Sequence, residues 1–239
     1  MPRNNRPETP HAGRFAKATN GPEGAPPTRR AAAPAGGRFE VRIIGGEWRG
    51  RKLHFPPAAG LRPTPDRVRE TLFNWLQFEL AGAHCLDLFA GSGALGFEAL
   101  SRGAREAVFV EADRRVARVL ESNARTTGLE KRAAVVVRTV ASFLRQDRPA
   151  GFDLVFFDPP WANPVDTELA GLWSAVARGG TFVVERGSDA EAWPGAPAVP
   201  EVRKYGTTTL FLYRKPAPPG LGANGEELAA HATIDPFEG

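Results

Sequence analysis

The feature that most constrains the fold is an alternation of short apolar runs with segments of helical spacing across the middle of the chain. Runs of this kind suit strands that are buried on both faces of a sheet. Strands are expected near residues 84–88, 106–110, 133–138, 152–157, 179–185, 201–205 and 208–214, and helices near 93–102, 113–127, 140–146 and 165–177. The alternation predicts a doubly wound α/β sheet that is mostly parallel and ends in an antiparallel C-terminal strand.

A smaller unit is expected ahead of this region. Residues 41–44 and 51–55 could pair as a hairpin through the glycines between them. A helix is predicted over Asp66–Leu80, because apolar residues recur at helical spacing from Val68 onward and the first residue of the segment is a good cap.

The sharpest local feature is the apolar run Phe152–Phe157 followed by Asp158-Pro159-Pro160-Trp161. The prolines have no N–H to donate, so a strand ladder must end there. The tip then offers a carboxylate, free carbonyl oxygens and a flat indole ring. These groups suit a planar base that carries an exocyclic amino group. A plain strand-terminating turn is the alternative interpretation.

A second candidate site is the segment Asp87–Gly96, whose three glycines form a G-x-G-x-x-G pattern between an expected strand and an expected helix. The next strand ends at Glu111, where a carboxylate can accept both hydroxyls of a ribose; a solvated helix cap would also place a glutamate there. The aspartate before the glycines would repel a pyrophosphate, but it could bind an ammonium group or hold the loop by backbone hydrogen bonds. This pattern favours S-adenosylmethionine over a nicotinamide dinucleotide.

In order along the chain, Asp-Leu-Phe-Ala-Gly-Ser-Gly, Val-Glu-Ala-Asp and Asp-Pro-Pro-Trp resemble the motifs of class I methyltransferases that modify exocyclic amines. Similarity continues in Arg42–Leu53, Arg62–Leu76 and Lys204–Gly206 and covers about residues 39–215. Over this length the chain resembles the RsmD family of bacterial guanine-N2 methyltransferases. The resemblance implies a Rossmann-like class I methyltransferase sheet, S-adenosylmethionine as cofactor, and a guanine of 16S ribosomal RNA, free or in an assembling small subunit, as substrate.

The resemblance also assigns site residues. The catalytic residues would be Asp158, Pro159, Pro160 and Trp161, where the family usually has Phe or Tyr in the last position. Cofactor contacts would come from Asp87, Phe89, Ala90, Gly91, Ser92, Gly93, Glu111, Ala112, Val140 and Ala141. The acidic residue that the family tends to carry after its third strand is missing here. Adenine would therefore be held by backbone groups near Val140 and Ala141, or by Ser142.

Composition divides the chain and suggests a partner. Residues 1–38 and 216–239 are rich in Pro, Gly and Ala without periodicity, so we expect disordered tails around one domain over residues 39–215. Residues 1–75 contain 14 Lys and Arg against 6 Asp and Glu, although the whole chain has a formal charge of only +4. A basic front half indicates a polyanionic partner, with RNA-binding candidates Arg49, Arg51 and Lys52 on the hairpin. A solvated tail and a solvated sheet edge explain the same charges.

Several other classes are disfavoured. The four histidines and the lone Cys85 show no metal-ligand spacing, so no metal is expected. The apolar stretches are too short to cross a bilayer and no secretory signal is visible, which predicts a cytoplasmic protein. A monomer is expected. An adenine-N6 methyltransferase acting on DNA or RNA is the alternative enzyme, because the same tetrapeptide serves it. A non-catalytic RNA-binding or assembly factor could retain the fold, whereas a dehydrogenase fits least.

Overall fold

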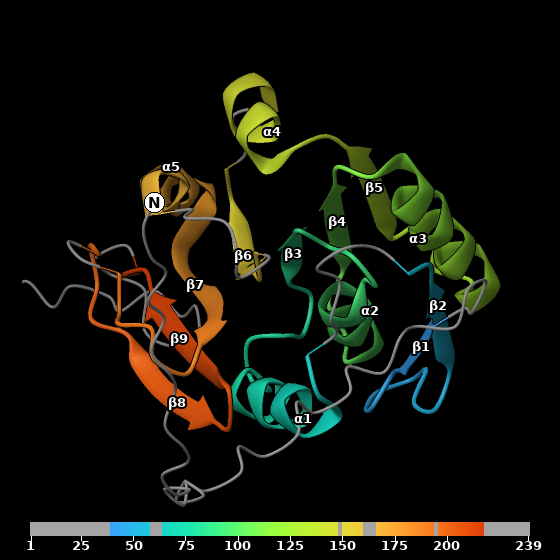
Figure 1. Ribbon diagram of the computed structural model, residues 1–239, viewed down its shortest axis with the longest axis horizontal. Coiled ribbons are helices and arrows are strands. Elements are labelled where there is room, and N and C mark those ends of the chain that lie inside the picture. The colour runs from blue at the N-terminus through green and yellow to red at the C-terminus, as the bar shows by residue number, and fades with distance from the viewer. Residues whose placement is uncertain (1–38, 58–63, 148–149, 160–165, 194–195, 218–239) are drawn as a thin grey trace, which may run out of the picture. The chain divides into compact units, whose positions relative to one another are not determined.

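A seven-stranded sheet forms the centre of this computed structural model (Figure 1). Along the sheet, the strands are β5 (Ala133–Val137), β4 (Glu106–Glu111), β3 (His84–Leu88), β6 (Phe152–Phe157), β7 (Val176–Gly187), β9 (Thr208–Arg214) and β8 (Glu201–Tyr205). The strands from β5 to β7 pair in parallel, β9 is antiparallel to β7, and β8 is antiparallel to β9. The predicted doubly wound sheet with an antiparallel C-terminal end is confirmed.

The structure describes residues 39–57, 64–147, 150–159, 166–193 and 196–217. The expected tail over residues 1–38, nearly all of the tail over residues 216–239, and the tip residues Pro160 and Trp161 lie outside these ranges.

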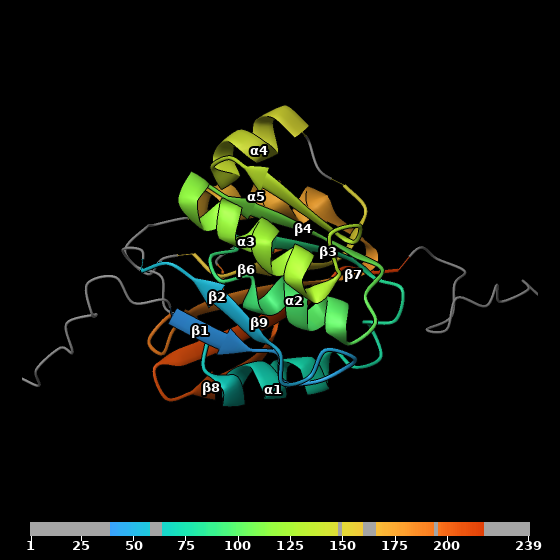
Figure 2. The same cartoon turned by 90° about the vertical axis from the view of Figure 1, so that its right-hand side faces the viewer.

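Helices cover both faces of the sheet. α1 (Asp66–Trp75), α2 (Ala94–Ser101) and α3 (Arg114–Thr127) lie on one face, and α4 (Val140–Asp147) and α5 (Asp166–Ala175) lie on the other (Figures 1 and 2). Successive side chains of each buried strand point to opposite faces. Phe109 and Phe156 therefore join the apolar core on the first face, and their neighbours Val110 and Phe157 join the core on the second.

Two element boundaries differ from the sequence-based prediction by three residues or more. α1 ends at Trp75 rather than at residue 80, but the turn that follows still buries Leu76 and Leu80. The apolar spacing therefore continued beyond the end of the helix. β7 begins at Val176, where a continuing helix was predicted, and its register against β6 shifts before Thr181. Only a glycine fits the bend at Gly180, because a Cβ atom there would lie 2.8 Å from the carbonyl oxygen of Asp153.

A separate two-stranded hairpin, β1 (Phe39–Arg42) and β2 (Lys52–Phe55), packs against α2 and α3. The pairing of Val41 with Leu53 confirms the predicted hairpin. Glu98 on α2 anchors one end, because its carboxylate accepts hydrogen bonds from the backbone N–H groups of Ile44 (2.7 Å) and Gly45 (2.8 Å). On α3, the amide of Asn123 bonds to both backbone groups of His54, at 3.1 and 2.7 Å.

Candidate active site

The carboxyl ends of four neighbouring parallel strands form one rim of the sheet. In the register of the sheet, Leu88 of β3 is the partner of both Val110 of β4 and Phe157 of β6. Phe157 is in turn the partner of Val184 of β7. The residues that come next at this rim are Glu111, Phe89, Asp158 and Glu185. Segments that are far apart in the sequence therefore meet at the same edge.

The rim contains the point where the sheet changes direction. The chain passes from β3 outward to β4 and β5, then returns to β6 on the other side of β3 and continues to β7. In open α/β sheets, ligands bind outside the carboxyl ends of the strands at such a point. The ring of Phe89 also meets the ring of Phe157 edge to face, with centroids 5.5 Å apart. The glycine turn after β3 and the Asp158 tip after β6 are thus direct neighbours.

The glycine turn joins β3 to α2 in a conformation that favours glycine. Phe89, Gly91 and Gly93 all have positive φ, at 57°, 50° and 74°, so two of the three positions take the residue that adopts this region without strain. The N–H of Ala90 donates to the carbonyl of Val110 at 3.0 Å, which fixes the turn to β4.

The rest of the turn packs closely on the sheet. A Cβ atom at Gly96 would lie 2.3 Å from the ring of Phe109, so the third glycine allows α2 to approach β4 closely. Ser92 is buried, and its hydroxyl oxygen accepts from the N–H of Ala94 at 3.3 Å. Because the turn is held at both ends, its backbone is preorganised before any ligand binds.

Two acidic side chains hold the glycine turn by accepting hydrogen bonds from its backbone. Asp87 is buried, and its Oδ2 accepts from the N–H of Gly96 at 2.9 Å. Glu111 accepts from the N–H of Gly91 at 2.9 Å with one oxygen and from the N–H of Asp113 at 2.8 Å with the other. Both side chains therefore hold backbone, the role that the sequence left open for Asp87. A carboxylate oxygen has more than one acceptor direction, so these bonds do not exclude a ligand hydroxyl at Glu111.

Burial acts strongly on the acidic residues of the rim. Burial, followed by the charge of Glu111, raises the pKa of Asp87 to about 8, although the hydrogen bond from Gly96 opposes this rise. Burial and then the charges of Glu185 and Asp87 hold the pKa of Asp158 well above its usual range, against the nearby Thr64 hydroxyl. A carboxyl group that is shielded from water resists ionisation, and its carboxylate is therefore a strong proton acceptor.

The remaining predicted cofactor residues lie at the β4 and β5 side of the rim. The N–H of Arg138, just after β5, donates to the carbonyl of Glu111 at 3.0 Å, which brings the start of α4 to the end of β4. Val140 is buried there, Ala141 is half-buried, and Ala112 is exposed. The structure thus brings the predicted cofactor residues together with the described part of the Asp158 tip, Asp158 and Pro159.

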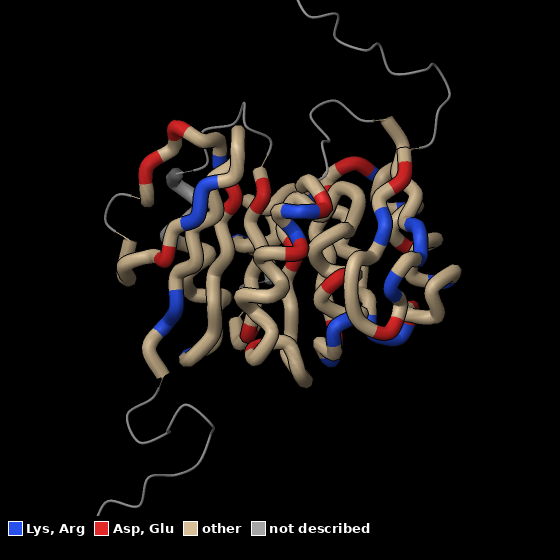
Figure 3. Tube along the Cα trace, turned by 90° about the horizontal axis from the view of Figure 1, so that it is seen from below, with Lys and Arg blue, Asp and Glu red and all other residues tan. Residues whose placement is uncertain are grey.

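The three hairpin cations proposed for RNA differ in how free they are. Lys52 pairs with Glu40, with Nζ 2.8 Å from a carboxylate oxygen. Arg51 donates to the carbonyl of Thr126 on α3 at 3.4 Å. The side chain of Arg49 is exposed, and among the described residues it makes neither an ion pair nor a side-chain hydrogen bond. In the view of Figure 3, basic and acidic positions are interspersed over the described chain.

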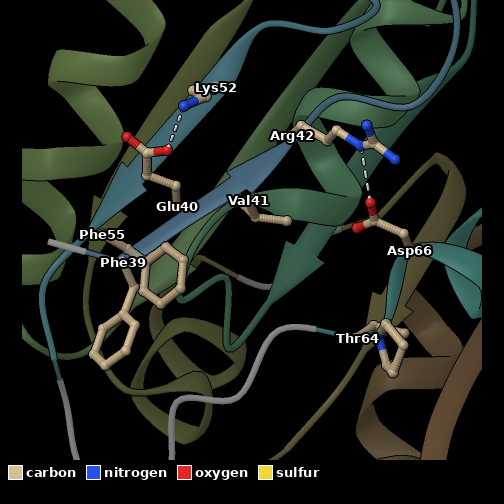
Figure 4. Close-up of a pocket in the computed structure, with 9 residues that line it drawn as sticks. Phe39, Glu40, Val41, Arg42, Lys52, Phe55, Thr64 and Asp66 are labelled. Atoms are coloured by element: carbon tan, nitrogen blue, oxygen red, sulfur yellow. Dashed lines mark hydrogen bonds and ion pairs between the residues drawn. The ribbon is translucent and has the colours of Figure 1, made fainter. Parts of the chain in front are cut away.

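A cavity of about 460 Å³ opens between the hairpin and the segment before α1 (Figure 4). The rings of Phe39 and Phe55 stack on one side of it, with centroids 5.6 Å apart, and Arg42 pairs with Asp66 at 3.0 Å on the other. Thr64 lines the same cavity. Its hydroxyl donates to Glu185 at 2.7 Å, so the wall of the cavity is bonded to the rim.

Several charged residues that organise the site were not predicted from the sequence. Arg69 on α1 is fully buried and donates to the carbonyl of Arg42 (2.9 Å) and to Asp66 (2.7 Å). Its second terminal nitrogen lies 3.7 Å from the buried carboxylate of Glu98. A glutamate within the apolar helix Ala94–Ser101 was the available signal, because a charge in such a place needs partners.

Within the described ranges, no helix is both long and apolar enough to span a bilayer. The same residues contain no group of three or more His, Cys, Asp or Glu side chains that could hold a metal ion.

Comparisons with known proteins agree with this geometry. Residues 41–214 match the family model described as conserved hypothetical protein 95. The chain is 54% identical over 136 residues to the ribosomal RNA small subunit methyltransferase D of Escherichia coli K12, which covers 57% of this chain and 68% of that protein. The solved structure of yhhF from Escherichia coli has a TM-score of 0.67 and 38% identity and covers 75% of this chain and 100% of that one.

A more distant solved structure is similar in fold alone. It is an RNA methyltransferase of Salinibacter ruber in complex with S-adenosyl-L-homocysteine, with a TM-score of 0.53 and 16% identity, covering 65% of this chain and 94% of that one.

Proposed function

The chain belongs to the RsmD family of methyltransferases, and on that premise we propose that it transfers a methyl group from S-adenosylmethionine to N2 of a guanine in small-subunit 16S ribosomal RNA. The observation that carries the proposal is the position of Asp158. It follows β6 at the point where the sheet changes direction, directly beside the glycine turn. A cofactor on the turn and an acceptor base at the tip would share one rim.

The residues of the rim fit S-adenosylmethionine. Glu111 is half-buried at the end of β4, where its free acceptor directions can receive ribose hydroxyls. Ala141 is half-buried and Ala112 is exposed, and adenine would lie beside them, held by backbone groups. The buried Asp87 favours a positive ligand nearby, because a cation would offset the cost of its charge. When bound, the cofactor supplies a methyl group that its positive sulfur activates for transfer.

The chain's own contribution is to present the amine. The amino nitrogen of guanine is a poor nucleophile, because its lone pair is delocalised into the ring. Asp158 and the carbonyl of Pro159 would accept the amino hydrogens and so favour a nucleophilic geometry at the nitrogen. Trp161 would stack on a base turned out of its helix or loop. Holding the reacting groups in line contributes several kcal/mol to such a reaction.

A matched pair of variants on one strand tests the role of Asp158. Asp153 lies near the start of β6, far from the rim, where its carboxylate accepts from the N–H of His84 at 2.8 Å. Asp158→Ala should lower methyl transfer to small-subunit particles on the order of a hundredfold or more, while calorimetry shows that S-adenosylmethionine still binds. Asp153→Ala should keep its activity. Near-normal turnover of Asp158→Ala would reject the role.

The same calorimetry separates enzyme from non-catalytic factor. An intact glycine turn and Glu111 should bind the cofactor, whereas an assembly factor that only retained the fold would show no heat of binding. A ribosomal substrate would place the protein in the cytoplasm, and we predict that it acts as a monomer. Arg49, Arg51 and Lys52 are proposed to contact RNA phosphates, with Arg49 the least engaged within the described chain.

A further inference from the structure

Glu185 is a buried carboxyl at the rim to which the proposed chemistry assigns no part. Val184 of β7 is level with Phe157 of β6, so the residues that follow them, Glu185 and Asp158, lie on neighbouring strands at the same height. Only 6% of Glu185 is exposed. Its charge is the largest cause, after burial, of the raised pKa of Asp158. The two carboxyl groups therefore act directly on each other.

Glu185 is held in place by threonines from two other elements. The hydroxyl of Thr64, just before α1, donates to Oε2 of Glu185 at 2.7 Å. The hydroxyl of Thr208, at the start of β9, is a second hydrogen-bond partner. Both threonines are 4% exposed, so water competes little for these bonds. Burial raises the pKa of Glu185, and the hydrogen bonds from Thr64 and Thr208 oppose this rise, because hydroxyl donors favour the charged form of a carboxyl.

Among the described residues, further groups act on the pair. Asp87 on β3 adds a further negative charge that acts on Asp158, and Glu111 on β4 acts in turn on Asp87. The Thr64 hydroxyl works in the opposite direction on Asp158. Two carboxyls in so dry a place titrate as a pair, because the second charge must form beside the first.

We propose that Glu185 is a positioning residue for Asp158: its charge, held by the hydroxyls of Thr64 and Thr208, makes Asp158 a better acceptor for the proton that the methylated amine loses. The inference rests on the proposed function. When the amino nitrogen forms a bond to the methyl carbon, the bond between that carbon and the sulfur of the donor breaks with its electrons left on sulfur, and the nitrogen becomes positively charged. One of its N–H bonds then breaks, the bonding electrons stay on nitrogen, and the proton passes to the carboxylate of Asp158 and later to water. A base is most effective when it titrates near the working pH.

Two variants should move the pH profile of methyl transfer in opposite directions. Glu185→Gln keeps an oxygen for the Thr64 hydroxyl but removes the charge, so the acid limb of the single-turnover rate should move to lower pH. Its plateau should fall on the order of tenfold, because the remaining base is weaker. Thr64→Val removes a donor that favours the charged forms, so its acid limb should move to higher pH. Cofactor affinity should stay near the wild-type value in both.

The chain offers a matched control on β7 itself, four residues before Glu185. The hydroxyl of Thr181 donates to Oε2 of Glu79 at 2.6 Å, the same kind of bond away from the rim. Thr181→Val and Glu79→Gln should leave the acid limb where the wild type has it. A purely structural loss would lower the whole profile without moving it. An unmoved acid limb in Glu185→Gln would overturn the proposal.

A readout that needs no methyl acceptor separates this inference from the proposed function. The side-chain carboxyl carbon of Asp158 can be followed by carbon-13 NMR and assigned with Asp158→Asn. Its titration should move to lower pH in Glu185→Gln, and an unchanged titration would overturn the inference. Failure of the wild type to transfer a methyl group would instead count against the proposed function, while the titration still decides the role of Glu185.

Discussion

Replacing Asp87 with asparagine should make the stability of the protein less sensitive to pH. Asp87 is 3% exposed, and its Oδ2 accepts from the N–H of Gly96 at 2.9 Å. An asparagine oxygen can keep that bond but has no charge to bury. The wild-type carboxyl has its pKa raised from 3.8 to about 8, first by burial and then by the charge of Glu111.

The direction of this pH dependence follows from the number of protons that the folded and unfolded chains bind. Between these two pKa values the folded protein keeps a proton on Asp87 that the unfolded chain has lost, so the free energy of unfolding falls as pH rises. The contribution is fully present below pH 3.8 and is lost as pH rises through about 8. At about 1.36 kcal/mol for each pH unit, the difference corresponds to roughly 6 kcal/mol. That is a large part of the stability of an ordinary domain.

Urea unfolding at a series of pH values from 5 to 9 measures this effect. The free energy of unfolding of Asp87→Asn minus that of the wild type should increase from pH 5 to about pH 8 and level off above it. Titrating groups that do not interact with Asp87 act alike on both proteins and cancel in the difference. A difference that stays constant from pH 5 to 9 would refute the reasoning, because it would mean that Asp87 titrates alike in the folded and unfolded chain.

Three further predictions concern the framework of the site. Gly96→Ala should lower the urea midpoint and weaken cofactor binding measured by calorimetry, because the new Cβ would lie 2.3 Å from the ring of Phe109. Overpacking of this kind costs about 1–3 kcal/mol, and an unchanged midpoint and affinity would contradict the prediction. Glu98→Ala should lower the free energy of unfolding by about 3 kcal/mol, because it leaves buried partners unpaired. It should also speed hydrogen exchange of the hairpin amides, and exchange rates equal to those of the wild type would argue against Glu98 as the anchor of the hairpin. Replacing Arg49 and Arg51 by Gln should weaken RNA binding. The slope of the logarithm of the binding constant against the logarithm of the salt concentration should become shallower by about one to two, and an unchanged slope would exclude contact of these side chains with RNA phosphates.

Much of the site could be predicted because its signals are local. A strand buried on both faces must be short and apolar, and Phe152–Phe157 ends where the prolines begin. The glycine turn is equally local, since Gly91 and Gly93 occupy backbone positions with positive φ. Parallel strands with crossover helices place their carboxyl ends at one edge, so the meeting of the Asp158 tip with the glycine turn follows from topology alone.

The parts that could not be predicted depend on register and on long-range contacts. Glu185 follows an apolar run like any strand-terminating residue, and only the pairing of β6 with β7 brings it beside Asp158. Its partner Thr64 lies 121 positions away in the sequence. Glu111 was expected to serve a ribose, but its side chain also holds the N–H of Gly91. Residue type and position did not show that the chain itself would occupy these oxygens.

The central claim is that the rim brings a methyl donor to the exocyclic amine of a guanine in small-subunit ribosomal RNA. The most direct test incubates the protein with isotope-labelled S-adenosylmethionine and small-subunit particles from cells that lack it, then digests the RNA and identifies the labelled nucleoside by mass spectrometry. The account predicts N2-methylguanosine. Labelled methyladenosine, or no labelled nucleoside from particles that the protein binds, would contradict it.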